Sequence, residues 1–149
     1  MDNLIKCLNE YLSDLKVFAC KLQNYHWNVE GKEFFQMHEK LEEYYNSTNN
    51  DIDEIAESIL MLGGQPVGSL KDFMDNTKIV EAKNEKISSC MILDILIQDF
   101  NILLEKVIKI KEEADSNKVY LISTLMDDAI KIYSKNLWML NQTKTLEKK

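Results

Sequence analysis

The chain has 149 residues, which fits a single domain, 1–149, that can form a hydrophobic core unaided. It contains four glycines and one proline, too few for the turns of a many-stranded β fold, so the composition favours long helices. The formal net charge of −7 disfavours nucleic acids and anionic membranes as partners, because both attract proteins through Lys and Arg.

The first half of the chain carries the pattern of two long amphipathic helices. Apolar residues recur at helical spacing in a first stripe, made of Leu4, Leu8, Tyr11, Leu15, Phe18 and Leu22. We expect this helix to end between Asn28 and Gly31. The same spacing recurs in a second stripe, made of Phe34, His38, Leu41, Tyr45, Thr48, Ile52, Ile55, Ile59 and Leu62. Gly63 and Gly64 predict the end of this second helix.

The second half begins with a long connection. Periodicity fails from Gln65 to about Asn84, apart from a short capped segment at Ser69 to Met74. A third helix is predicted from about Ile87 to Glu113 and, after a polar turn at 115–117, a fourth from about Val119 to Lys144. Short, long and short connections predict an all-α fold, a ferritin-like four-helix bundle with a long crossover carrying a short helix.

Two absences bear on the location of the protein. The start of the sequence lacks the basic and continuous apolar regions of a signal peptide, and no segment approaches the length of a transmembrane helix. We therefore expect a cytoplasmic protein. We also expect Cys7, Cys20 and Cys90 to be reduced, partly buried thiols, since their spacing fits neither a disulfide framework nor a CxxC metal site.

The chemistry is predicted to lie in five possible metal ligands, His26, His38, Glu42, Asp53 and Glu57. The last four are symmetric about a point between Ser47 and Thr48. A second copy of this helix, laid antiparallel and crossing there, would place His38 opposite Glu57. It would also place Glu42 opposite Asp53. These two acids are about 16 Å apart along one helix, too far to share an ion. We therefore predict that two chains build two identical sites.

Each candidate has a simpler interpretation when it is considered alone. A single histidine such as His26 is more often found at a helix end or an interface, and single acids such as Asp53 are ordinarily solvated. Trp27 is explained as well by packing at an interface as by a redox role. The joint pattern favours a site, because the only two histidines of the chain both belong to it.

The types of ligand narrow the choice of metal. Imidazole and carboxylate together suit Fe(II), Mn(II) or Zn(II). A ferritin-type di-iron centre inside one bundle uses Glu-x-x-His pairs. No such pair occurs in this sequence, which argues against that intramolecular centre.

Several segments together resemble the Dps family, the mini-ferritins, over nearly the whole chain: YHWNVEG at 25–31, FFQMHEKLEE at 34–43, DIDEIAE at 51–57, LGGQP at 62–66 and NLWML at 136–140. The resemblance implies a hollow homo-oligomer of twelve subunits with ferroxidase centres at two-fold interfaces. It assigns His26, His38 and Glu42 to one subunit, and Asp53 and Glu57 to its neighbour. It also implies oxidation of iron, Fe(II), preferably with hydrogen peroxide, and storage of ferric mineral, which protects against oxidative damage.

The sequence departs from the family pattern in several places. Glu42 stands where Asp is more usual, and Ser58 replaces a common Arg. Thr124 stands where many relatives place an acid that lines a three-fold pore. The substitute candidates for an iron route are Asp115, Asp127 and Asp128.

Two alternative functions remain open. The Dps family is also associated with DNA binding through a Lys-rich tail. The start of this chain lacks such a tail, and its end offers only Lys144, Lys148 and Lys149 beside Glu147, so we do not expect direct DNA binding. The first alternative is a DNA-compacting structural protein with secondary iron chemistry. The second is a helical bundle that binds Zn or Mn without turnover.

Overall fold

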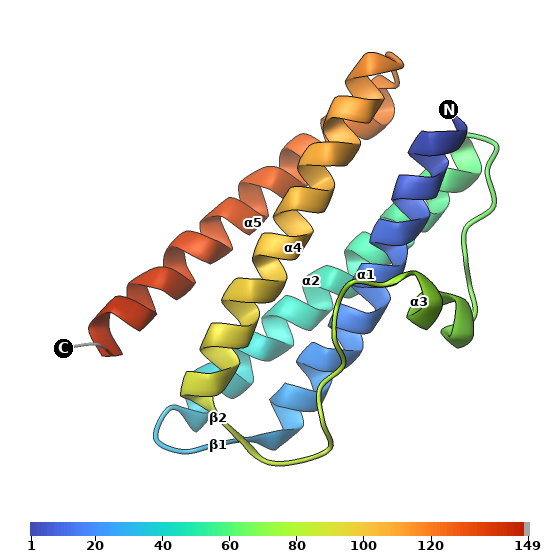
Figure 1. Cartoon of the computed structure of the whole chain (residues 1–149). Helices are drawn as coiled ribbons and strands as arrows, with labels where there is room; N and C mark the ends of the chain where they lie inside the picture. The colour runs from blue at the N-terminus through green and yellow to red at the C-terminus, as the bar shows by residue number, and fades with distance from the viewer. Residues whose placement is uncertain (148–149) are drawn as a thin grey trace.

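Four long helices form the body of the protein in the computed structural model, which describes residues 1–147 (Figure 1). They are α1 (Asp2–Asn28), α2 (Phe34–Met61), α4 (Ser89–Ser116) and α5 (Tyr120–Glu147). Helices α1 and α2 form one antiparallel hairpin, α4 and α5 form another, and α1 packs on α4. The crossover carries α3 (Leu70–Asn76), which lies against α1. The predicted fold class is therefore confirmed.

The core forms where the predicted stripes face one another. All six residues of the first stripe are at most 1% exposed. Opposite them, α4 buries Leu96, Phe100 and Leu103, while α5 buries Ile122 and Met126. Removing these side chains from water is the main force that holds the two hairpins together.

Buried ion pairs also join α1 to α4. The Lys21 ammonium lies 2.7 Å from Asp99, and both side chains are 5% exposed. A second pair joins Lys106 to Glu10 at 2.8 Å. Burial raises the pKa of the Asp99 carboxyl, and the hydrogen bond and charge of Lys21 oppose that shift. The pair of Lys21 with Asp99 holds α1 just over one turn before His26.

The predicted end of α2 is confirmed in detail. Gly63 has a φ of +83°, a backbone conformation that favours glycine. Its N–H donates to the carbonyl of Leu60, and the N–H of Gly64 donates to that of Ile59. This is a Schellman motif, which satisfies carbonyls that the helix end leaves free.

Two short strands are the main feature that the sequence analysis missed. The strand β1 (Val29–Glu30) pairs in parallel with β2 (Ile87–Ser88). Because β2 occupies these two residues, α4 begins at Ser89 and not at the predicted Ile87. The Ser88 hydroxyl caps α4 by accepting from the N–H of Met91. The pairing ties the connection between α1 and α2 to the start of α4.

The turn between the last two helices also differs from the prediction. Helix α4 continues to Ser116, so the turn lies at 117–119 and not at 115–117. Lys118 takes a positive φ of 57° within this turn. The i,i+4 pair of Lys111 with Asp115 supports the additional helical residues. Helix α5 continues to Glu147, slightly beyond the predicted end at Lys144.

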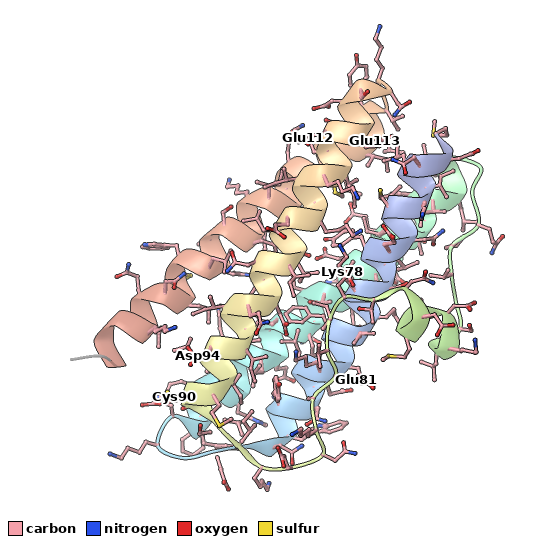
Figure 2. The ribbon with its side chains drawn as sticks, viewed as in Figure 1. Lys78, Glu81, Cys90, Asp94, Glu112 and Glu113 are labelled. Atoms are coloured by element: carbon pink, nitrogen blue, oxygen red, sulfur yellow. The ribbon has the colours of Figure 1, made fainter. Side chains whose placement is uncertain are left out.

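The predicted partial burial of the cysteines was wrong for two of the three, and no disulfide forms among the described residues. Cys7 is buried, but Cys20 and Cys90 are exposed. Cys90 lies in the first turn of α4, where the helix faces outward (Figure 2). Cys20 lies on the part of α1 that faces a surface pocket beside α3. Among the described residues, no helix is both long enough and apolar enough to cross a membrane.

Candidate metal centre

The two histidines form a reciprocal pair where α1 ends and α2 begins. The Nδ1 atom of His26 lies 2.7 Å from the backbone oxygen of His38, and the Nδ1 atom of His38 lies 2.7 Å from the backbone oxygen of His26. The rings stack with centroids 3.7 Å apart and an angle of 12° between their planes. His26 is 8% exposed, and His38 is half-buried.

This geometry determines which ring nitrogen carries the proton. A backbone carbonyl can only accept a hydrogen bond, so each Nδ1 must be the donor. In the neutral imidazole, Nε2 then keeps its lone pair. Histidines that bind metals are commonly oriented in this way, with one nitrogen donating to the protein and the other facing the metal. The pair therefore presents two Nε2 atoms suited to metal binding.

The local fold explains why the pair can form. The last carbonyls of a helix have no partner within that helix. The carbonyl of His26 is among them, since α1 ends at Asn28. The connection to α2 is short, and Gly31 turns it with a φ of +117°. Phe34 covers the other face of His38, with ring centroids 4.8 Å apart.

Glu42 lies one helical turn after His38 and is exposed. The Tyr45 hydroxyl donates to its Oε1 across a long distance of 3.5 Å. The ring of Tyr45 also meets the ring of His26 edge to face, with centroids 5.4 Å apart. Tyr45 thus connects a carboxylate candidate to a histidine candidate. The spacing of Tyr45 predicts only its place in the apolar stripe, because nothing in that spacing reveals this second contact.

Asp53 and Glu57 are exposed on the distal half of α2. At about 1.5 Å per residue, Asp53 lies roughly 16 Å from Glu42 along the helix. Within residues 1–147, no group of three His, Cys, Asp or Glu side chains is arranged to hold a metal ion. One chain therefore brings His26, His38 and Glu42 into one neighbourhood and leaves the other two candidates apart. Their meeting across two chains stays a prediction.

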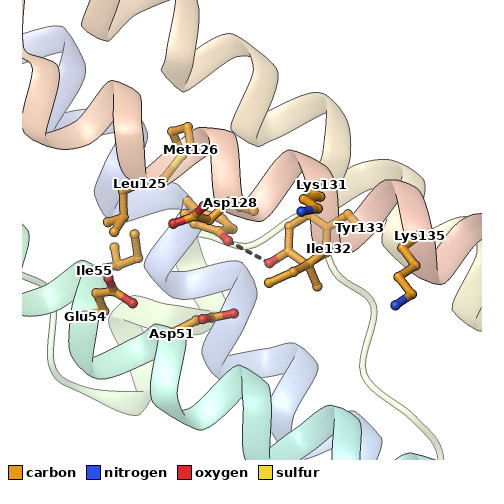
Figure 3. A pocket seen from close by; sticks show the side chains of 12 residues that line it. Asp51, Glu54, Ile55, Leu125, Met126, Asp128, Lys131, Ile132, Tyr133 and Lys135 are labelled. Atoms are coloured by element: carbon orange, nitrogen blue, oxygen red, sulfur yellow. Dashed lines mark hydrogen bonds between the residues drawn. The ribbon is translucent and has the colours of Figure 1, made fainter.

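A carboxyl that the sequence analysis did not single out lies on another side of α2. Asp51 lines a pocket of about 500 Å³ between α2 and α5 (Figure 3). Burial raises the pKa of this carboxyl to about 6, and the negative charge of Glu54 adds to the shift. An acid on an amphipathic helix gives no sign that another helix will cover it, so the sequence contains no signal for Asp51.

The acids proposed for an iron route have different surroundings. The Lys111 ammonium lies 2.8 Å from Asp127 and 3.7 Å from Asp115. Both carboxylates are thus partly neutralised within the chain. Asp128 instead lines the pocket that contains Asp51. Thr124 is exposed on α5.

Comparisons with known proteins agree with this geometry. A family model described as a ferritin-like domain matches residues 5–148. DNA protection during starvation protein 2 of Bacillus anthracis is 35% identical over 92% of this chain and 93% of its own length. Antigen TpF1 of Treponema pallidum is 33% identical over 91% of this chain and 77% of its own length.

Solved structures give the same result. The Dps protein of Vibrio cholerae O1, described as a member of a broad superfamily of ferritin-like diiron-carboxylate proteins, superimposes with a TM-score of 0.91 and 36% identity. The match covers 95% of this chain and 88% of that one. The structure of antigen TpF1 has a TM-score of 0.93 and 32% identity over 95% and 91% of the two chains. The chain therefore belongs to the Dps family of ferritin-like proteins.

Proposed function

We propose that this protein is a ferroxidase and iron store. It oxidises Fe(II), preferably with hydrogen peroxide, at sites shared by two subunits of a closed shell of twelve, and it stores ferric mineral in that shell. The reciprocal pair of His26 and His38 is the observation that carries the proposal, because its hydrogen bonds leave both Nε2 atoms available to a metal.

The proposed site draws on two chains. One subunit supplies His26, His38 and Glu42, while Asp53 and Glu57 come from the adjoining copy. The symmetric spacing along α2 supports this division, since an isologous interface makes the same pair of contacts twice. The exposure of both distal acids in one chain also supports it.

The residues divide the chemical work between them. The imidazoles fix the position of the iron, since their rings are held by backbone hydrogen bonds and by stacking. The carboxylates add negative charge, which favours Fe(III) over Fe(II) because the product carries the higher charge. Each Fe(II) gives up one electron, and hydrogen peroxide accepts two, so two irons reduce one peroxide to the oxidation level of water. Hydrolysis of the ferric product releases protons to solvent.

The test begins with the assembled protein loaded with Fe(II) without oxygen, followed by a pulse of hydrogen peroxide. We expect ferric absorbance to rise while peroxide disappears in a ratio of two irons per peroxide. A His26→Ala/His38→Ala variant should lose the fast phase and still assemble. If the parent binds Fe(II) but neither oxidises it nor consumes peroxide, the alternative of a bundle that binds Zn or Mn without turnover replaces the proposal.

Nothing in the described structure favours DNA compaction as the main function. Several relatives are named for the protection of DNA during starvation. The name applies to those proteins and does not say how they protect DNA. The net charge of −7 opposes contact with a polyanion. Lys148 and Lys149, two of the three lysines of the short basic end, lie outside the described residues.

A further inference from the structure

Two buried tyrosines form a hydrogen-bonded pair inside the bundle, far along α1 from His26. The hydroxyl oxygens of Tyr11 and Tyr133 are 2.6 Å apart, and the side chains are 1% and 4% exposed. The bond joins α1 to α5. Two hydroxyls use only one of their two protons in such a bond, so the other proton needs a different acceptor.

A pocket gives this second proton access to water. The pocket of about 500 Å³ between α2 and α5 is lined by both tyrosines, of which Figure 3 labels Tyr133. Burial raises the pKa of Tyr11 and that of Tyr133, so both phenols stay protonated near neutral pH. Loss of an electron from either phenol must therefore release its proton. Water that enters this pocket can accept that proton, and the Asp51 carboxyl lines the same pocket.

Aromatic side chains connect this pair to the surface. The ring centroid of Phe100 lies 5.8 Å from that of Tyr133 and 5.2 Å from that of Tyr44. Trp138 is 60% exposed and lines a second pocket together with Tyr44. Trp138 follows Tyr133 by five positions on α5, about 7.5 Å along the helix axis. The two ring contacts of Phe100 are short enough for electron transfer between side chains, and Trp138 borders the same pocket as Tyr44.

We infer that the pair of Tyr11 and Tyr133 is a redox-active centre that accepts oxidising equivalents from Trp138. A one-electron radical oxidant removes an electron from the indole, which loses its N–H proton to water. An electron then passes from Tyr133 to the indolyl radical, the phenol proton enters the pocket water, and the indole regains a proton from solvent. The products are intact Trp138 and a Tyr133 phenoxyl radical that accepts a hydrogen bond from Tyr11.

The transfer runs in this direction because a phenol is easier to oxidise than an indole when both lose their protons at neutral pH. The hydrogen bond from Tyr11 stabilises the phenoxyl oxygen further. The step requires no metal, so it goes beyond the proposed iron chemistry and can fail or succeed independently of it. As a consequence of this transfer, the radical moves from the exposed indole of Trp138 to the buried phenol of Tyr133.

Pulse radiolysis of the assembled, iron-free protein tests this inference. Azide radicals oxidise tryptophan selectively, and we expect the indolyl absorbance to decay as phenoxyl absorbance grows. The Tyr11→Phe/Tyr133→Phe variant should lose most of that growth, whereas Tyr120→Phe, which alters a tyrosine that is 66% exposed, should keep it. Trp138→Phe should lose the growth that Trp27→Phe retains. An undiminished phenoxyl yield in the double tyrosine variant would overturn the inference.

A second measurement needs no substitution. Electron paramagnetic resonance of the freeze-quenched parent in light and heavy water should show a phenoxyl radical with an exchangeable proton coupling, which the hydrogen bond from Tyr11 supplies. A phenoxyl signal that does not change in heavy water would place the radical on a tyrosine outside the pair. That outcome would also reject the inference, whether or not the double variant folds.

Discussion

The candidate ligands in the two halves of α2 differ in how far their own chain buries and holds them. Near the start of the helix, His38 is half-buried, stacked on His26 and bonded to its backbone. Further along, Asp53 and Glu57 extend from the exposed face. The first half is thus positioned by its own chain before any metal arrives. The second half is exposed to solvent in its own chain.

At the proposed shared site, this difference would couple assembly to chemistry. A preorganised half loses little conformational freedom on binding, whereas exposed acids gain a fixed geometry only when another subunit covers them. The proposed centre would therefore be complete only in the oligomer. Variants that separate the two halves test this interpretation most directly.

Mixed assembly should give the largest effect. Shells made only of His38→Ala chains or only of Glu57→Ala chains should be almost inactive, since each lacks one half of every site. Equal co-assembly should restore about a quarter of the parent rate. Half of the interfaces would then be mixed, and one of the two sites at each mixed interface would be intact. The initial rise of ferric absorbance after a peroxide pulse measures this recovery.

The control for that experiment mixes the two shells after assembly, without dissociation, and should show no recovery. An intramolecular site predicts no recovery in either case, because every chain would still carry a damaged site. That result, or a stable monomer of 17.4 kDa in light scattering, would remove the basis of the shared-site proposal.

The next largest effect should come from substituting one candidate ligand of each half and comparing metal binding and stability. Asp53→Lys and His26→Ala should both abolish metal binding, measured by titration with Zn(II). Their stabilities should differ. His26→Ala should lower the free energy of unfolding by about 1–3 kcal/mol, because it removes a buried ring and its hydrogen bond.

Asp53→Lys should change the free energy of unfolding by less than about 0.5 kcal/mol, since the side chain is exposed. Glu105→Lys, which reverses an exposed charge on α4, is the matched control and should alter neither binding nor stability. Denaturant unfolding of the metal-free proteins supplies the measurement. Equal destabilisation by His26→Ala and Asp53→Lys would contradict the difference between the two halves.

Much of this architecture could be predicted from the sequence, and the reasons are physical. The stripe from Leu4 to Leu22 specifies a buried face because side chains at helical spacing align on one side of a helix. The two glycines after α2 predict its end because a positive φ is needed there. These signals depend on side chains close to one another in the chain, so one sequence is enough to recognise them.

Other features depend on partners that the sequence does not identify. The hydrogen bond from each histidine ring is accepted by a backbone carbonyl. Every residue has such a carbonyl, so no residue type predicts this bond. The pairing of β1 with β2 is likewise made by backbone groups, in strands too short to show alternation. The burial of Asp51 depends on how α5 packs across α2. The spacing of five ligands could be recognised, but the orientation of their side chains could not.

A smaller effect should distinguish two acids on the same helix, Asp51 in the pocket and Asp53 on the exposed face. The folded pKa of Asp51, about 6, exceeds its ordinary value of 3.8. The native state therefore binds the proton more tightly, and stability falls as the pH rises between these values. Asp51→Asn should raise the free energy of unfolding at neutral pH by about 1–2 kcal/mol, a figure reduced for partial exposure.

This advantage of Asp51→Asn should diminish as the pH falls below about 6 and vanish below 3.8, where the parent carboxyl becomes protonated in both states. Asp53→Asn, on the exposed face of the same helix, is the matched control. Thermal unfolding of the assembled proteins across this range provides the measurement. If the gain from Asp51→Asn stays constant with pH, the carboxyl is not the buried titrating group that the pocket indicates.

The smallest effect should be that of salt on the protection of DNA. If the histidine and carboxylate halves together remove Fe(II) and peroxide, protection requires no contact with the duplex, and the net charge of −7 opposes such contact. Nicking of plasmid DNA by Fe(II) and peroxide should therefore be suppressed equally at low salt and at salt that abolishes DNA complexes in a gel shift. The His26→Ala/His38→Ala shell should not protect at either salt. Protection that declines with salt in parallel with DNA binding, or that survives in this variant, would favour a shell that coats DNA over one that consumes the reagents.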